Sequence, residues 1–564
     1  MRILSFHSRK LCAEAYMGEI VKFVICFFII FNLSVVLAIG IQFPVGYTSY
    51  DWQLGGPVST WCRTDPIANG VHVCWLFSNF APAIDRNRKY NFYNCTTHSL
   101  HSAEGEIVYT QRSGFGNMDY NPITGCAVVI THQNVSGGLR VNAARDQAPG
   151  ACIFDYCIGP LGYSDPVISV SYNQAIHCAM MDYYTNDSLW YARIQPWCSW
   201  STPINICSPA PQPMFHSQNI AASKISNKVI IVWECSEDPW PERAYYRLSN
   251  DGGLTWQPPT QLPFPPAQGM IPEFTISSLF GMFDNQDNLH IVASVADTGH
   301  TIPAGIWHWC PINNPQWSCI YFYNPDTLAA PVGYNAIFAT RPSIVQASNT
   351  GYLYVAWEQF DSLNYEPLSN LARADIWIAE SPNNGLTWQN QQPITTPNTT
   401  SKRYPCAGGV DHDTLSVAYM IDSIAGFENY TQGRTTRNPI VLHRIKVPLP
   451  SGIEEQFTHD ALRFTIDASP NPFTSYTVIR YGLAYASPTL RVTLPAQSKV
   501  SLELYDVTGR LIKSLTNIHH QTSNIFSVIW DGKDNNGIQV KSGVYFYTLK
   551  TADKIITNKI IKTN

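Results

Sequence analysis

Three arginines occupy similar places relative to apolar, strand-like runs of the chain. Arg63, Arg341 and Arg403 each lie about 12 to 16 residues before the end of such a run, near the start of the preceding strand. A planar guanidinium matches a carboxylate through two parallel hydrogen bonds. If these strands line one channel, the arginines would gather into an anion-binding site. The alternative is that each pairs with a neighbouring carboxylate at its strand end.

Five further residues could take part in chemistry beside these arginines. They are Tyr404, Glu234, Glu358, Asp65 and Asp119. Glu234 and Glu358 each follow a tryptophan at the end of an apolar run. We interpret that similarity as a structural repeat, with a shared catalytic role as the alternative.

Metal binding is not indicated by the sequence. No spacing of cysteine and histidine has the form of a zinc site. Residues 284–288 and 531–537 are rich in Asp and Asn, but residues 531–537 lack the terminal glutamate of an EF-hand loop. We interpret both as tight turns between strands, and we expect no metal and no cofactor.

Two eight-residue stretches share the pattern S-x-[DN]-x-G-x-T-W. The Asp or Asn can bond its own backbone, the glycine supplies positive φ, and the tryptophan adds apolar surface. The pattern resembles the Asp box of sialidase-like β-propellers, which implies a structural role and no catalytic one. Its residues are Ser249, Asp251, Gly253, Thr255 and Trp256 in one copy and Ser381, Asn383, Gly385, Thr387 and Trp388 in the other.

Seven apolar strand cores recur about 50 to 60 residues apart, which is the period of a four-stranded propeller blade. Most follow a polar turn, which makes each the second strand of a hairpin. We predict an all-β protein with a β-propeller over residues 41–448. Seven blades are favoured, and six is the alternative if the first repeat is an accessory hairpin. The cores are residues 71–75, 127–130, 175–179, 229–233, 289–293, 353–357 and 415–419.

The resemblance to sialidases implies an enzyme hypothesis. In that family three arginines hold the substrate carboxylate, a tyrosine activated by a glutamate is the nucleophile, and an aspartic acid is the general acid/base. The family's F-R-I-P motif has no counterpart, because residues 340–343 read T-R-P-S, and no Tyr/Glu pair is identified by motif. We therefore expect a glycan- or protein-binding propeller, with a sialidase-type glycoside hydrolase and a structural surface component as alternatives.

The composition changes after a linker at residues 449–466. The motifs SPNPF, LYDVTGR, WDGKDNNG and SGVYFYTL follow in that order. This order resembles the FlgD-like immunoglobulin-like (Ig-like) domains of exported bacterial proteins and the related sorting domains of the type IX secretion pathway. The resemblance covers residues 467–564. It implies a β-sandwich for sorting or surface attachment, with the secretion machinery as its partner.

The N-terminal 40 residues contain the only long apolar run, which predicts a secretory signal peptide cleaved near Ala38 or Gly40. An uncleaved signal anchor is the alternative, and Met17 is a second candidate start. A net charge of −5 without a basic patch argues against nucleic-acid binding. We expect an exported monomer, extracellular or on the outer cell surface.

Export permits disulfide bonds among the 15 cysteines. Close spacing makes three pairs candidates, although the sequence cannot assign them. These pairs are Cys152/Cys157, Cys198/Cys207 and Cys310/Cys319.

Overall fold

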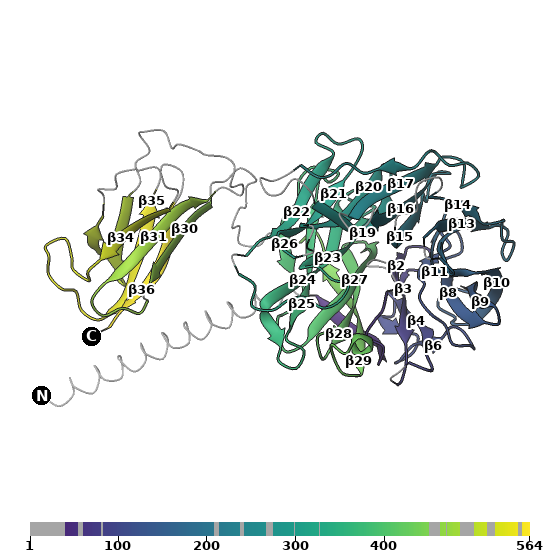
Figure 1. Cartoon of the computed structure of the whole chain (residues 1–564), viewed down its shortest axis with the longest axis horizontal. Coiled ribbons are helices and arrows are strands. Elements are labelled where there is room, and N and C mark those ends of the chain that lie inside the picture. Colours follow the sequence, from purple (N-terminus) through teal and green to yellow (C-terminus); the bar gives the residue numbers. More distant parts are fainter. Residues whose placement is uncertain are drawn as a thin grey trace, which may run out of the picture. The chain divides into compact units, whose positions relative to one another are not determined.

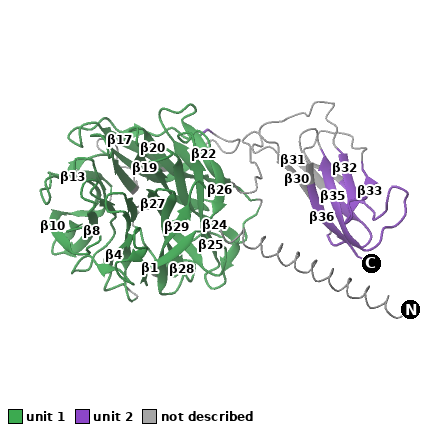
Figure 2. Cartoon of the chain, turned by 180° about the vertical axis from the view of Figure 1, so that it is seen from behind, with its two compact units in different colours: residues 1–265, 273–452 green, residues 266–272, 453–564 purple. Residues whose placement is uncertain are grey.

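The structure is a computed structural model, and the chain divides into two compact units. The first comprises residues 1–265 and 273–452, and the second residues 266–272 and 453–564 (Figure 2). The described residues are 40–54, 60–80, 83–185, 187–207, 214–236, 242–266, 274–297, 299, 301–325, 327–449, 463–469, 471–484, 501–515, 525–550 and 555–563. The predicted signal peptide lies almost entirely outside them. Among these residues no helix has the length and apolar character needed to cross a membrane.

Seven antiparallel sheets form the first unit, a seven-bladed β-propeller (Figure 1). Each predicted apolar core falls on the second strand of its blade, so the prediction of seven blades is confirmed. Blade 1 contains β2 (Cys62–Asp65), β3 (Gly70–Phe77), β4 (Asn87–Asn94), β5 (Ser99–Leu100) and β6 (Glu106–Ile107). Blade 2 contains β7 (Met118–Tyr120), β8 (Ala127–Val135), β9 (Gly138–Asp146) and β10 (Phe154–Leu161). Blade 3 contains β11 (Tyr163–Val170), β12 (Ile176–Asp182), β13 (Leu189–Ile194) and β14 (Ile204–Asn205), and blade 4 contains β15 (Met214–Ala222), β16 (Val229–Ser236), β17 (Glu242–Ser249) and β18 (Thr260–Gln261).

The remaining blades follow the same order, except that the last one takes its fourth strand from the N-terminal end of the propeller. They are β19 (Phe274–Phe283), β20 (Leu289–Asp297), β21 (Ala304–Trp309) and β22 (Trp317–Tyr323); β23 (Ala339–Gln346), β24 (Leu353–Glu366), β25 (Leu371–Ser381) and β26 (Gln389–Pro393); β27 (Ser401–Asp411), β28 (Thr414–Asp422), β29 (Asn438–Lys446) and β1 (Ile41–Thr48).

Ring closure uses strands from both ends of the propeller. β1 pairs with β29 in an antiparallel register that matches Ile41 with Arg444 and Thr48 with Asn438. The innermost strands β2 and β27 also lie next to each other. Because neighbouring blades cover both faces of every sheet, second strands such as β3 are buried along their whole length. This explains why their sequences are nearly continuous apolar runs.

Each Asp-box turn is held by its own polar side chains. Asp251 accepts hydrogen bonds from the backbone N–H groups of Leu254 and Thr255, and Ser249 Oγ accepts the N–H of Gly253 at 2.9 Å. The Trp256 ring lies 4.9 Å from the ring of Tyr191, which belongs to the preceding blade. The turn therefore packs its own blade against the preceding one.

The second copy of the box repeats this arrangement. Asn383 accepts the N–H of Thr387 at 2.9 Å, Ser381 Oγ accepts the N–H of Gly385 at 2.9 Å, and the Trp388 ring lies 5.4 Å from His308 of the preceding blade. Both boxes thus use their polar atoms within the turn and their tryptophan between blades.

The second unit contains two small antiparallel sheets. Its core includes Trp530, Phe473 and Ile479, all buried. One sheet has the order β30 (Arg463–Ser469), β31 (Thr477–Ala484), β34 (Ile525–Trp530), and the other β33 (Leu511–Ser514), β32 (Ser501–Asp506), β35 (Gly543–Lys550), β36 (Ile555–Lys562).

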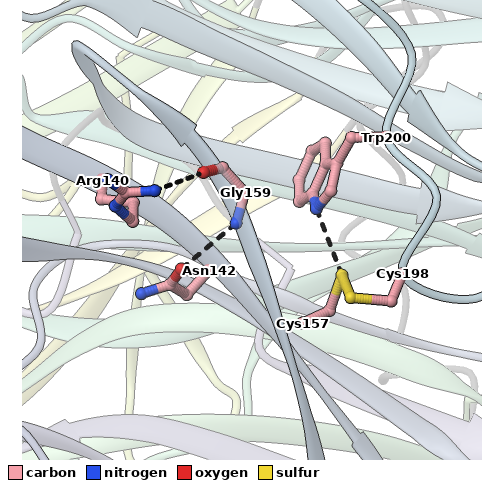
Figure 3. The surroundings of a disulfide bond; sticks show 6 residues. All are labelled: Arg140, Asn142, Cys157, Gly159, Cys198 and Trp200. Carbon is pink, nitrogen blue, oxygen red and sulfur yellow. Dashed lines mark hydrogen bonds between the residues drawn. A yellow bond between two sulfur atoms is a disulfide. The ribbon is translucent and has the colours of Figure 1, made fainter.

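One disulfide bond joins two blades of the propeller. It connects Cys157 on β10 with Cys198, which follows β13, and Trp200 donates its indole N–H toward Cys157 Sγ at 3.2 Å (Figure 3). The candidate pairs Cys152/Cys157 and Cys198/Cys207 were therefore wrong. Cys310 and Cys319 are free thiols. Spacing along the chain misleads here because the two bonded cysteines meet through the packing of blades 2 and 3.

Candidate functional site

The two faces of the propeller differ in how the innermost and second strands of each blade are connected there. On the loop face each innermost strand begins and each second strand ends. On the turn face a short turn joins these two strands. Arg403 pairs with Met420 near the end of β28, and Thr340, beside Arg341, pairs with Glu358 on β24. Both arginines therefore lie toward the loop face.

Arg341 and Arg403 share one buried carboxylate. Arg341 Nη1 lies 2.9 Å and Arg403 Nε 2.7 Å from Glu358 Oε1. The backbone N–H of Tyr404 donates to Glu358 Oε2 at 2.9 Å. The Tyr404 ring lies 5.0 Å from the Arg341 guanidinium and 5.2 Å from that of Arg403. We call these four residues the arginine cluster.

The arginine cluster has more donors than acceptors. Its side chains are at most 2% exposed. Within the described part of the chain, Arg341 Nε, Arg403 Nη2 and Tyr404 Oη have no hydrogen-bond partner. Two guanidinium charges face one glutamate charge in the cluster. Because unpaired buried donors are unfavourable, an anion placed against these atoms would stabilise the cluster.

A repeated backbone bulge explains the similarity of Glu234 and Glu358. Innermost strands β19 and β27 bulge at Ser278 and Tyr404, whose φ values are 55° and 59°. The N–H of each residue then points to the preceding blade, where Glu234 or Glu358 accepts it at 2.7 or 2.9 Å. Glu234 and Glu358 therefore accept the N–H of a bulged residue at equivalent positions in two blades, as a structural repeat predicts.

Arg63 does not join the other two arginines. It pairs with His72 near the start of β3, at the turn face. Its Nε lies 3.3 Å from Asp119 Oδ1, and Lys224 Nζ lies 2.8 Å from Asp119 Oδ2. Asp65, another candidate from the sequence, also lies at the turn face, where its Oδ2 is 3.3 Å from His72 Nε2. The three candidate arginines therefore do not converge: Arg63 pairs with a neighbouring carboxylate, Asp119, at the turn face, which is the alternative considered for each of them.

Two aspartates near Arg403 bind protons more readily than usual. Burial, followed by the nearby charge of Asp51, raises the pKa of Asp422 to about 8. Burial, followed by the charge of Glu428, raises the pKa of Asp51 to about 6, although the Glu428 N–H donates to its carboxylate at 2.8 Å. Asp422 is therefore mostly neutral at pH 7, so it adds little negative charge beside Arg403.

The tyrosine is not set up as an ionised nucleophile. Its contact with Glu358 is made through the backbone N–H, and its hydroxyl has no described partner. Burial raises the pKa of Tyr404 far above its usual range, despite the two neighbouring guanidinium groups. The hydroxyl is therefore suited to donate a hydrogen bond in its neutral form.

Aromatic rings from three separate segments gather on the loop face. Trp52 precedes β2, Tyr334 precedes β23, and Phe427 and Tyr430 lie between β28 and β29, where η1 (Glu428–Tyr430) is a single 3-10 turn. The Trp52 ring lies 5.3 Å from Tyr430, 5.9 Å from Phe427 and 6.4 Å from Tyr334. Phe427 in turn lies 5.5 Å from the Arg403 guanidinium.

These loop residues were not found from the sequence. Asp51, Trp52 and Phe427 lie in loops and Asp422 ends β28; none belongs to a repeated motif, and ring closure brings Asp51 and Trp52 to the last blade. Among the described residues, no group of three or more His, Cys, Asp or Glu side chains is placed to hold a metal ion.

Comparison with known proteins supports the assignment of the C-terminal region. Residues 479–554 match the family model of the FlgD Ig-like domain. This confirms the resemblance seen in the four C-terminal motifs. No curated protein matches the chain.

Solved structures similar to the chain include several propellers of low sequence identity. An ulvan lyase is 11% identical, with 72% of this chain and 96% of that chain covered and a TM-score of 0.46. A Trypanosoma rangeli sialidase is 9% identical, with coverages of 81% and 85% and a TM-score of 0.37. A Penicillium chrysogenum α-L-arabinanase is 12% identical, with coverages of 59% and 94% and a TM-score of 0.36.

The chain thus combines a seven-bladed propeller, which carries two Asp-box turns, with a C-terminal region that matches the family model of the FlgD Ig-like domain over residues 479–554.

Proposed function

We propose that the propeller binds an acidic glycan on its loop face and that the arginine cluster recognises a carboxylate of that glycan. One observation carries the proposal: Arg341 Nε, Arg403 Nη2 and Tyr404 Oη are buried donors without a partner among the described residues. A carboxylate has four lone-pair positions and could accept from several of them at once. Because the donors are buried, binding requires covering side chains such as Phe427 to shift.

The proposal also concerns where the protein is found and what each of its domains does. The disulfide bond between Cys157 and Cys198 is typical of an oxidising compartment, which supports export. We propose an extracellular or surface-bound bacterial protein whose FlgD Ig-like domain serves sorting or attachment through the secretion machinery. Residues 41–448 would act as the binding domain, residues 449–466 as the linker, and residues 467–564 as the sorting domain.

The test is Tyr404→Phe, which removes only the unpartnered hydroxyl. Without ligand we expect the variant to be as stable as the wild type or slightly more stable. Calorimetric titration with sialic, glucuronic and galacturonic acids should show binding that weakens roughly 10-fold when this charge-assisted hydrogen bond is lost. Arg63→Gln is the control, since Arg63 lies at the turn face. Equal affinity of Tyr404→Phe and the wild type would contradict the proposal.

A second candidate function is glycoside hydrolysis. The observation in its favour is the raised pKa of Asp422 and of Asp51 near Arg403, since a carboxyl group that stays protonated near neutral pH can act as a general acid. Hydrolysis of a fluorogenic sialoside tests this function, with Arg341→Ala as the comparison. Activity that is present in the wild type and lost in the variant would support it, and activity that survives would exclude the arginine cluster as its site.

A further inference from the structure

Two more arginines lie on the loop face without a carboxylate partner among the described residues. Arg86 Nε donates to the carbonyl of Ser113 at 3.1 Å, and its Nη1 donates to the hydroxyl of Tyr50 at 3.0 Å. Arg112 Nε donates to the carbonyl of Ala83 at 3.3 Å. The backbone N–H of Arg86 donates to the same Ala83 carbonyl at 3.2 Å, so the two arginines are neighbours, and burial followed by the charge of Arg86 lowers the pKa of Arg112.

The nearby carboxylates are already engaged. Asp85 accepts hydrogen bonds from the hydroxyl of Ser78 and the amide of Asn79, and Asp51 accepts the N–H of Glu428. Neither forms an ion pair with Arg86 or Arg112 in the described part of the protein. The local surface therefore carries an excess of positive charge.

The buried side chain of His132 lies next to this pair of arginines. Burial lowers the pKa of His132; the charge of Asp165 raises it, and the charges of Arg86, Arg112 and Arg88, each a smaller effect, lower it. Arg88 is itself only 1% exposed, and its Nε has no partner among the described residues. The charges of three arginines therefore reach His132, together with that of Asp165, whose backbone N–H donates to His132 Nδ1 at 3.0 Å.

Aromatic rings connect the pair with the arginine cluster. The Arg86 guanidinium lies 5.3 Å from the ring of Phe115, and Phe115 lies 5.5 Å from Trp52. Trp52 contacts Phe427, which packs on Arg403. We call this line of residues, from Arg86 to Arg403, the aromatic strip. Trp52 and Phe115 are half-buried, so they can offer apolar surface to the faces of sugar rings, while Phe427 is buried beneath them; flanking polar groups fix orientation.

We propose that Arg86 and Arg112 form a second anion-binding subsite and that the ligand is an acidic polysaccharide that follows the aromatic strip. The proposal rests on the proposed function for the idea of a glycan ligand, and it adds that the ligand carries charges on more than one sugar. A terminal acidic sugar would occupy the arginine cluster alone and would leave Arg86 and Arg112 without a partner.

The test uses the full chain and immobilised polygalacturonate, alginate, hyaluronan and chondroitin sulfate, with neutral dextran for comparison. The variant Arg86→Gln/Arg112→Gln should weaken binding to at least one acidic polysaccharide roughly 10-fold or more, and it should reduce the salt dependence of binding. Arg145→Gln/Arg510→Gln removes the same charge from arginines already paired with Asp155 and Asp506, so it should bind like the wild type.

The outcomes separate this inference from the proposed function. The inference is overturned if no acidic polysaccharide binds more tightly than an acidic monosaccharide, or if the Arg86/Arg112 variant and its control weaken binding equally. Monosaccharide binding that depends on Tyr404 would then still support the proposed function. Conversely, polysaccharide binding that depends on Arg86 and Arg112 but is unchanged in Tyr404→Phe would uphold the second subsite and refute the arginine cluster as a carboxylate site.

Discussion

Glu358 is the residue on which the arginine cluster depends. It forms ion pairs with both Arg341 and Arg403 and also accepts the backbone N–H of Tyr404. Removing one member of a buried ion pair leaves an uncompensated charge in a medium where charge is poorly solvated. The same glutamate that keeps the unliganded cluster folded would compete with an incoming carboxylate for the two guanidinium groups.

We therefore predict that Glu358→Gln destabilises the propeller by about 3 kcal/mol or more, because two buried guanidinium charges lose their counterion. Urea unfolding followed by tryptophan fluorescence measures the change. Glu104→Gln is the matched control, since its ion pair with Arg437 is more than half exposed and is worth under about 1 kcal/mol. Similar losses in both variants would show that the cluster is not held by this charge pairing.

At the scale of the element, each Asp-box turn packs its own blade against the preceding blade. Gly253 has a φ of +78°, and a Cβ added there would lie 1.8 Å from the Tyr191 hydroxyl. Tyr191 is only 2% exposed, and its hydroxyl is 2.7 Å from His177 Nδ1, so it cannot easily move aside.

Gly253→Ala should therefore destabilise the propeller by about 3 kcal/mol, the sum of backbone strain and overpacking. Gly351→Ala separates the two effects, because Gly351 has a similar φ of +74° and nothing within 4 Å of its added Cβ. That control should lose only about 1 kcal/mol. Thermal unfolding of both variants gives the comparison, and equal shifts would mean that the contact with Tyr191 is unimportant.

Blade positions could be predicted from the sequence because burial on both faces leaves a continuous apolar run in every second strand. The site was predicted only in part. Arg341 and Arg403 lie 16 residues before the ends of their runs and meet on Glu358, whereas Arg63 lies 12 residues before its own. Arg63 pairs with His72, before the end of its run, whereas Arg403 pairs with Met420, just beyond the end of its own, so Arg63 lies about 13 Å nearer the turn face at roughly 3.3 Å per residue.

The loop residues could not be predicted for a different reason. Trp52, Arg86 and Tyr334 lie far apart in the sequence and outside the repeated strands, so no periodicity or motif marks them. Their proximity depends on the order of blades around the ring, which spacing along the chain does not encode.

At the scale of the whole molecule, the disulfide bond ties blade 2 to blade 3. It closes a loop with a sequence separation of 41, for which chain entropy predicts a stabilisation of about 4 kcal/mol. We expect Cys198→Ser to lower the melting temperature of the protein. A reducing agent should lower the melting temperature of the wild type by a similar amount and leave the variant unchanged. Cys95→Ser, which alters a free thiol, is the control; a wild type unaffected by reduction would contradict the prediction.

The pairing of β1 with β29 has a consequence for the order in which the protein is made. Ribosomes synthesise β1 first and β29 some 400 residues later, so β1 lacks its partner strand until nearly the whole propeller exists. Asp51 follows β1, whereas Arg403 and Glu428 come from the last blade. A nascent or truncated propeller would therefore lack both its closure and its complete loop face, and the binding site proposed above would form only after β29 has been made.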